Sequence, residues 1–217
     1  MVEAAVATVR EREVRARRAP IVPVAVPKLW PGSTIVCIGT GPSLTGADVA
    51  YCRNRARVIV VNDAYRLADW ADVLYACDGK WWYWHRQAKD LAAFEGLKYA
   101  LDPKAHAYGA QVLRNTGDTG LDVRPDCVRN GRNSGYQAIN LAVHLGAARI
   151  LLLGYDMQGD HYFGHHPDQS RPPFGVCLKR FQTLVKPLRD LQVAVINCTR
   201  KTALTCFPCQ PLEEALP

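Results

Sequence analysis

Short apolar runs, mostly of β-branched residues, recur along the chain from residue 34 onward, and each is followed by polar residues. Five runs have the length of a strand but lack the apolar–polar alternation of a half-buried strand. This pattern indicates strands that are buried on both faces of a parallel sheet. The expected strands are Thr34–Ile38, Arg57–Val61, Val73–Cys77, Ile150–Leu153 and Val193–Asn197.

Stretches with helical periodicity separate these strands. The expected helices are Gly46–Asn54, Lys80–Lys89, Ser134–Leu145 and Phe174–Leu191. Strands that alternate with helices are typical of a doubly wound fold. We therefore expect an α/β, Rossmann-like fold with a mostly parallel sheet flanked by helices. Residues 100–132 are rich in Gly, Asp, Asn and Arg, which predicts loops at the edge of a site.

The first 30 residues have a different character. Residues 1–19 are charged and helical in pattern, and the spaced prolines Pro20, Pro23 and Pro27 exclude a helix after them. We expect an N-terminal arm and Pro-rich linker over residues 1–30, outside the domain core, and a single Rossmann-like α/β domain over residues 31–217. A homo-oligomer formed through the arm is a further expectation.

Composition and charge exclude some classes of protein. The chain is 48% hydrophobic and 22% charged, which is ordinary for a globular domain. No apolar run approaches the roughly 20 residues of a membrane span, and no signal-peptide pattern opens the chain, so we expect a cytoplasmic protein. The net charge of +7 is spread along the sequence. It suits an anionic ligand but does not indicate a nucleic-acid-binding protein.

The eight cysteines are expected to be reduced. Cys37, Cys77 and Cys198 lie in or beside apolar runs, where a thiol packs as a small hydrophobic group. Cys206 and Cys209 have the spacing of a zinc-ligand pair, but the chain has no second pair of that kind.

Polar residues follow every expected strand. Because ligands of open α/β sheets bind beyond the carboxyl ends of the strands, these exits predict one polar cleft. In chain order the exits are Gly39-Thr40-Gly41-Pro42-Ser43, Asn62-Asp63-Ala64-Tyr65, Asp78-Gly79-Lys80, Gly154-Tyr155-Asp156 and Cys198-Thr199-Arg200-Lys201.

Two of the loops are candidates for anion binding. GTGPSL, residues 39–44, matches neither GxGxxG nor a Walker loop, so it is either a simple turn or a loop whose backbone approaches a ligand. Asn133-Ser134-Gly135 opens the expected helix that ends at Leu145. Ser134 is predicted to be its N-cap, with free amides beside it.

A third loop, residues 159–168, is rich in titratable groups. Its members are Asp160, His161, His165, His166 and Asp168. Histidine suits general base catalysis near neutral pH, the same set could ligate a metal, and a solvated polar loop is the third interpretation.

Taken together, five segments resemble a known superfamily over about residues 34–207. The chain resembles small bacterial sialyltransferases with a variant glycosyltransferase-A fold. It resembles equally motility-associated glycosyltransferase-like and 6-hydroxymethylpterin pyrophosphokinase-like proteins, whose relatives occur in phages and prophages. The segments are IVCIGTGPSL, VIVVNDAY, NSGYQAINLAVHLGAARILLLGYDM, GDHYFGHH and INCTRKTALTCF.

The resemblance implies roles for particular residues. A histidine of the His161-Tyr162-Phe163-Gly164-His165 stretch would be the general base, with His161 favoured over His165. Tyr155 and Tyr162 would steady the departing phosphate. The candidate residues for binding the nucleotide donor are Gly39, Thr40, Gly41, Pro42, Ser43, Asn62, Asp63, Asn133, Ser134 and Gly135.

Three functions stay open from the sequence. The first is a nucleotide- or nucleotide-sugar-binding enzyme that transfers a glycosyl group to an unidentified acceptor without a metal. The second is phosphoryl or pyrophosphoryl transfer, in which Asp63, Asp78 and Asp156 would hold Mg²⁺. The third is a non-enzymatic phage accessory protein that binds a nucleotide or a protein.

Overall fold

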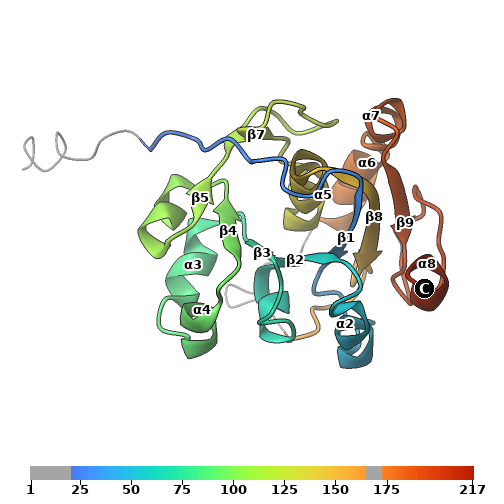
Figure 1. Cartoon of the computed structure of the whole chain (residues 1–217), viewed down its shortest axis with the longest axis horizontal. Coiled ribbons are helices and arrows are strands. Elements are labelled where there is room, and N and C mark those ends of the chain that lie inside the picture. Colours follow the sequence, from blue (N-terminus) through green and yellow to red (C-terminus); the bar gives the residue numbers. More distant parts are fainter. Residues whose placement is uncertain (1–20, 165–172) are drawn as a thin grey trace, which may run out of the picture.

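The computed structural model describes residues 21–164 and 173–217 (Figure 1). Within these residues seven strands form one parallel sheet in the order β5-β4-β3-β2-β1-β8-β9. The strands are β1 (Ser33–Ile38), β2 (Arg57–Val61), β3 (Val73–Tyr75), β4 (Leu97–Ala100), β5 (Gln111–Val112), β8 (Ala147–Leu153) and β9 (Ala194–Asn197). A separate pair joins β6 (Arg114–Asn115) to β7 (Cys127–Val128).

The strand order reverses direction once. From β1 the chain adds β2, β3, β4 and β5 on one side, and it then returns to place β8 on the other side of β1. The exits of β1 and β8 therefore diverge at a topological switch point, where open α/β sheets bind their ligands. The α/β, Rossmann-like fold expected from the sequence is confirmed.

Helices cover both faces of the sheet (Figure 1). On one face lie α5 (Ser134–Leu145), α6 (Phe174–Gln182) and α7 (Val185–Asp190). On the other lie α2 (Gly46–Cys52), α3 (Gly79–His85), α4 (Lys89–Ala93) and α8 (Leu212–Ala215). Two short 3₁₀ helices, η1 (Asn62–Arg66) and η2 (Pro103–Tyr108), follow β2 and β4.

Burial on both faces explains the continuous apolar strands. In β1, Ile35 and Cys37 belong to the core under α5, whereas Val36 and Ile38 belong to the core under α2. Successive side chains of a strand point to opposite faces, so a strand between two cores needs an apolar residue at every position.

The structure corrects some of the expected elements. The single helix expected over Phe174–Leu191 is two, because α6 ends at Gln182 and α7 starts at Val185. Pro187 lacks the N–H that a continuous helix needs, and in the first turn of α7 that lack is tolerated. The two strands β4 and β5 were not expected.

The linker before β1 packs against the domain. Val24 N donates to Val112 O at 2.9 Å, and Val26 N donates to Pro125 O at 2.9 Å. Val26 is 4% exposed and belongs to the core under α5. The prediction that residues 1–30 lie outside the core is therefore wrong for Val26, because its backbone bonds and apolar side chain anchor the linker. Residues 1–20 lie outside the described ranges.

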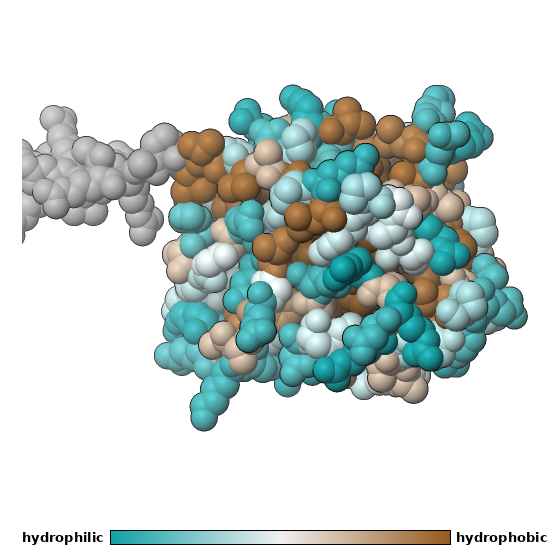
Figure 2. All heavy atoms as spheres, in the orientation of Figure 1, coloured by the Kyte–Doolittle hydropathy of each residue, from teal (hydrophilic) through white to brown (hydrophobic). Residues whose placement is uncertain are grey.

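The surface near this linker is apolar. Ile21 and Val24 are 39% exposed, and Val22 is 74% exposed. Figure 2 shows hydrophobic residues gathered where the described chain begins, whereas hydrophilic residues cover much of the rest of this face. No helix in the described part of the chain is both long enough and apolar enough to cross a bilayer.

Candidate functional site

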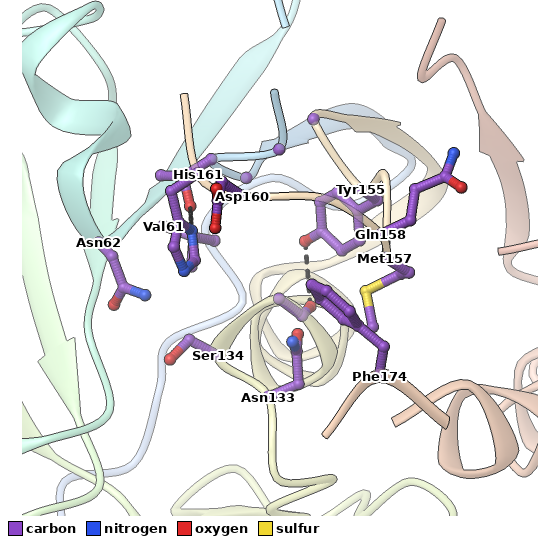
Figure 3. Close-up of a pocket in the computed structure, with 15 residues that line it drawn as sticks. Val61, Asn62, Asn133, Ser134, Tyr155, Met157, Gln158, Asp160, His161 and Phe174 are labelled. Carbon is purple, nitrogen blue, oxygen red and sulfur yellow. Dashed lines mark hydrogen bonds between the residues drawn. The ribbon is translucent and has the colours of Figure 1, made fainter. Parts of the chain in front are cut away.

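A pocket lies where β1 and β8 end, at the switch point of the sheet (Figure 3). It measures about 520 Å³, part of which is its open mouth. Three chain segments that are distant in sequence meet there: the loop after β1, the start of α5 and the loop after β8. The lining residues are Gly39, Thr40, Gly41, Val61, Asn62, Asn133, Ser134, Gly135, Gly154, Tyr155, Met157, Gln158, Asp160, His161 and Phe174.

The glycines of GTGPSL allow the β1 loop and the β8 loop to pack against each other. Gly41 N donates to Gly154 O at 2.8 Å. A Cβ on Gly39 would lie 2.7 Å from Gly154 O, and one on Gly41 would lie 2.0 Å from Asp156 Oδ2. Neither position has room for a side chain. The glycines of this loop therefore allow close packing of the two loops, and the packed loops form a wall of the pocket.

Asp156 anchors the GTGPSL loop by a hydrogen bond. Its side chain is buried, and Oδ1 accepts a hydrogen bond from Ser43 N at 2.9 Å. Its Oδ2 is buried and has no hydrogen-bond partner within the described residues. Burial raises the pKa of Asp156 above its usual value, and the hydrogen bonds from Ser43 offset only part of that effect.

The raised pKa of Asp156 predicts a pH-dependent effect of Asp156→Asn. Protonated Asp156 adds stability below the pKa of the unfolded chain, and this stability is lost as pH rises through the higher pKa of the folded protein. Asparagine keeps an oxygen for Ser43 N and does not titrate. We expect the stability of the variant, relative to the wild type, to increase from about pH 4 to about pH 8 in urea unfolding.

Asp122→Asn is the control for that measurement. Arg124 holds the pKa of Asp122 well below its usual range, so its stabilisation is present at neutral pH and is lost in acid. The relative stability of Asp122→Asn should therefore change with pH in the opposite direction. A difference between Asp156→Asn and the wild type that is independent of pH would contradict the assignment.

The N-terminus of α5 forms the second wall of the pocket. Asn133 is the N-cap, because its Oδ1 accepts from Tyr136 N at 3.1 Å. The prediction that Ser134 is the cap is wrong by one residue: the extended backbone of Asn133 places its own carboxamide over the first turn. The amides of Ser134 and Gly135 and the Ser134 hydroxyl find no hydrogen-bond partner within the described residues. They stand at the positive end of the helix dipole.

Tyr155 supports this wall from behind. The Tyr155 side chain is 3% exposed, and its hydroxyl donates to Gly135 O at 3.0 Å. A Cβ on Gly135 would lie 2.7 Å from Tyr155 Cε1, so the helix start also requires a glycine. The expected role of Tyr155 in steadying a phosphate is not supported, because its O–H proton is committed to Gly135 O.

His161 lies at the mouth of the pocket and is tied to the β1 loop. Its Nδ1 is 3.0 Å from Thr40 Oγ1, and Tyr162 N donates to Thr40 O at 2.7 Å. Figure 3 shows His161, Asn62 and Ser134 around one space. The Tyr162 side chain is 39% exposed, does not line the pocket and lies edge-on against Phe163. His165, the other candidate base, lies outside the described residues.

Asn62 enters the pocket from the end of β2. It has a left-handed backbone with φ of 51°, a conformation that asparagine tolerates better than most residues. Its carboxamide finds no hydrogen-bond partner among the described residues. Its side-chain donors and acceptors are therefore available to a ligand.

Asp63 points away from the pocket. Its Oδ1 is 3.0 Å from His85 Nε2, and the His85 ring stacks on Trp81 with centroids 4.2 Å apart. Burial opposes ionisation of Asp63, but His85 outweighs that effect and holds the pKa below its usual value. Asp63 is thus a structural partner of His85 rather than a pocket residue.

The Mg²⁺ site that the phosphoryl-transfer alternative would need, with Asp63, Asp78 and Asp156 as ligands, is not formed. Asp63 pairs with His85, Asp156 bonds to Ser43, and Asp78 is exposed at the start of α3. Across residues 21–164 and 173–217, no three His, Cys, Asp or Glu side chains lie close enough together to hold a metal ion. The strand-end rule places all three residues at one sheet edge, but local partners turn two of the carboxylates away.

Other expected site residues stand at the margin of the pocket. Pro42 and Ser43 lie in the β1 loop but do not line the pocket. Ser43 Oγ instead accepts a hydrogen bond from Lys201 N at 3.2 Å. Four lining residues were not among the residues expected from the sequence: Val61, Met157, Gln158 and Phe174. Of these, Val61, Met157 and Phe174 supply an apolar side. The positions of Val61, Met157 and Gln158 at or shortly after strand ends were the available signal, and Phe174, the first residue of α6, carried no such signal.

Comparisons of the chain with protein-family models, curated proteins and solved structures returned no match.

Proposed function

We propose that this pocket binds a nucleotide or a nucleotide sugar and that the protein transfers the glycosyl group to an acceptor hydroxyl. The observation that carries the proposal is the meeting of the β1 loop, the α5 start and His161 at the switch point of the sheet. Anionic ligands bind where helix amides and close backbone loops converge in this way.

The phosphate groups of the ligand would bind at the start of α5. The amides of Ser134 and Gly135 and the Ser134 hydroxyl are donors in need of acceptors there. An anion meets the positive end of the helix dipole. On the leaving phosphate, the same donors would stabilise the charge that develops as the glycosidic bond breaks.

The nucleoside or sugar would contact the polar and apolar sides of the pocket. The Asn62 carboxamide offers two donors and an acceptor that no described residue uses. Met157 and Phe174 offer apolar contact opposite it. A few directed polar groups set against apolar surface are typical of small-molecule sites.

His161 is the candidate general base. The tautomer in which its Nδ1–H donates to Thr40 Oγ1 carries the lone pair on Nε2. In the proposed step Nε2 takes the proton of the acceptor hydroxyl, and the acceptor oxygen forms a bond to the anomeric carbon. The bond from that carbon to the phosphate oxygen breaks, and its electron pair stays on the phosphate. The imidazolium returns the proton to solvent.

The alternatives receive less support. Mg²⁺-dependent phosphoryl transfer needs oxygen ligands that meet at the phosphates, and the expected carboxylates do not meet. A non-enzymatic nucleotide-binding or protein-binding role fits the fold but does not explain why a histidine, His161, lines the pocket.

A nucleotide panel tests the proposal. CMP, UDP and ATP would each be added with and without Mg²⁺ while thermal unfolding is followed. A ligand at 100 times its Kd stabilises the folded state by about 2.7 kcal/mol. We expect CMP or UDP to raise the Tm without metal. A shift from ATP that requires Mg²⁺ would favour phosphoryl transfer, and the absence of any shift would favour the non-enzymatic role.

A further inference from the structure

A second groove lies at the opposite edge of the sheet, where β1 and β2 begin. It measures about 1000 Å³ including open solvent. Its lining comes from the starts of β1 and β2, the turn after α2 and the segment before β3. We call it the arginine groove, and the lining residues are Ser33, Thr34, Asn54, Arg55, Ala56, Arg57, Trp70 and Asp72.

Aromatic rings hold three arginines around this groove. The guanidinium of Arg53 lies 5.6 Å from the Trp70 ring centre, that of Arg55 lies 4.2 Å from Tyr51, and that of Arg57 lies 5.2 Å from Trp30. Tyr51 O also accepts from Arg55 Nη1 at 3.0 Å. The contact between Arg57 and Trp30 joins the start of β2 to the segment that leads into β1. These contacts restrict side chains that would otherwise sample many rotamers.

The charge of the groove is only partly neutralised by carboxylates. Arg57 pairs with Asp72 at 2.8 Å, and the Asp72 carboxylate also accepts from Val58 N. Arg53 and Arg55 are exposed and form no ion pair with any carboxylate of the described residues. A fourth arginine adjoins the groove, because Arg149 Nε donates to Thr34 Oγ1 at 3.0 Å.

These features favour an extended anion over a small one. The Arg57 side chain is 52% exposed and Arg53 and Arg55 are also exposed, so the groove does not enclose a single phosphate ion. A polyanion would engage several guanidinium groups at once and would release its condensed counterions. Guanidinium planes backed by aromatic rings also offer flat outer faces on which unpaired bases can stack.

We propose that the arginine groove binds single-stranded nucleic acid. Arg53 and Arg55 would contact the phosphates, and bases would stack on the guanidinium faces that the rings hold in place. The charge excess is diffuse in the sequence, but the fold brings Trp30, Trp70 and Arg149 to the turn after α2 and the start of β2, which carry the three arginines. The groove and the pocket at the switch point lie at opposite edges of the sheet, so the proposal does not depend on the proposed glycosyl transfer.

The test is fluorescence anisotropy of a labelled, short single-stranded DNA with the full chain. We expect binding that weakens with salt between about 50 and 200 mM. The double variant Arg53→Gln/Arg55→Gln should bind about tenfold or more weakly at the lower salt concentration. Its slope of log K against log salt should be smaller by about 1.4, since each phosphate contact on a single strand contributes roughly 0.7.

The matched control is Lys104→Gln/Lys179→Gln. Lys104 lies on η2, Lys179 lies on α6, and both are exposed. Their replacement by glutamine removes the same net charge as the arginine double variant. The control should bind like the wild type. Three results would overturn the proposal: no binding by the wild type, an equal loss in both double variants, or displacement of the oligonucleotide by inorganic phosphate at the same phosphate concentration. Tighter binding of the matching duplex would overturn the preference for a single strand.

Discussion

Replacing His161 with alanine is expected to lower the rate of glycosyl transfer by about 10²–10⁴-fold while nucleotide affinity stays nearly unchanged. The imidazole is held at the pocket mouth by the 3.0 Å contact between its Nδ1 and Thr40 Oγ1. Its loss removes the proton acceptor but leaves the α5 start and Asn62, where the nucleotide is proposed to bind. Turnover would be measured beside nucleotide affinity.

His106→Ala is the matched control, because His106 is exposed on η2 and does not line the pocket. His165→Ala tests the other candidate base from the same loop. If His161→Ala and His165→Ala both keep full activity, the assignment of the base is wrong. If both lose nucleotide binding instead, the loop belongs to the ligand site and the general-base role has no support.

Gly41→Ala should destabilise the protein by about 1–3 kcal/mol, the usual effect of forcing extra atoms into a packed interior. The new Cβ would lie 2.0 Å from Asp156 Oδ2 and 2.7 Å from Gly154 O. The first contact involves a buried carboxylate and the second a backbone oxygen, so neither atom can move away without a cost in free energy. The loop or the carboxylate must move, and the bond between Asp156 Oδ1 and Ser43 N weakens as it does.

Gly46→Ala is the control for this measurement. Gly46 is the first residue of α2, and nothing lies within 4 Å of the position of its Cβ. Its substitution should change stability by no more than about 0.5 kcal/mol. Urea unfolding of both variants gives the comparison. Equal stabilities would mean that the close packing of the β1 and β8 loops does not constrain Gly41.

The fold could be predicted from the sequence where a single physical signal dominates. Arg57–Val61 and Ser134–Leu145 match the structure at both ends. The helix Ser134–Leu145 has well-defined ends, because Asn133 caps its start and Gly146 adopts a left-handed backbone just after its last residue. β4, with the sequence Leu-Lys-Tyr-Ala, was missed because its mixed residues carry neither a strand pattern nor a helix pattern.

The site could be predicted only in part. The strand-end rule predicted that Gly39, Gly41 and Asn62 share one cleft, and all three line the pocket, because the carboxyl ends of parallel strands meet at one edge of the sheet. The same rule misplaced Asp63, which the fold pairs with His85 from another helix. Side-chain partners that come from distant segments leave no pattern at the residue itself, so a tertiary structure is needed to tell an available carboxylate from a committed one.

The most direct test of the account measures nucleotide binding by Ser134→Glu and Ser134→Gln. A glutamate at the start of α5 favours the helix by about 0.3–1 kcal/mol, so the variant should fold at least as well as the wild type. Its carboxylate would occupy the place proposed for the phosphate and repel it. Calorimetric titration with CMP and UDP should show binding by the wild type and Ser134→Gln, and none by folded Ser134→Glu. Wild-type affinity in Ser134→Glu would contradict the claim that the pocket at the switch point binds the phosphate.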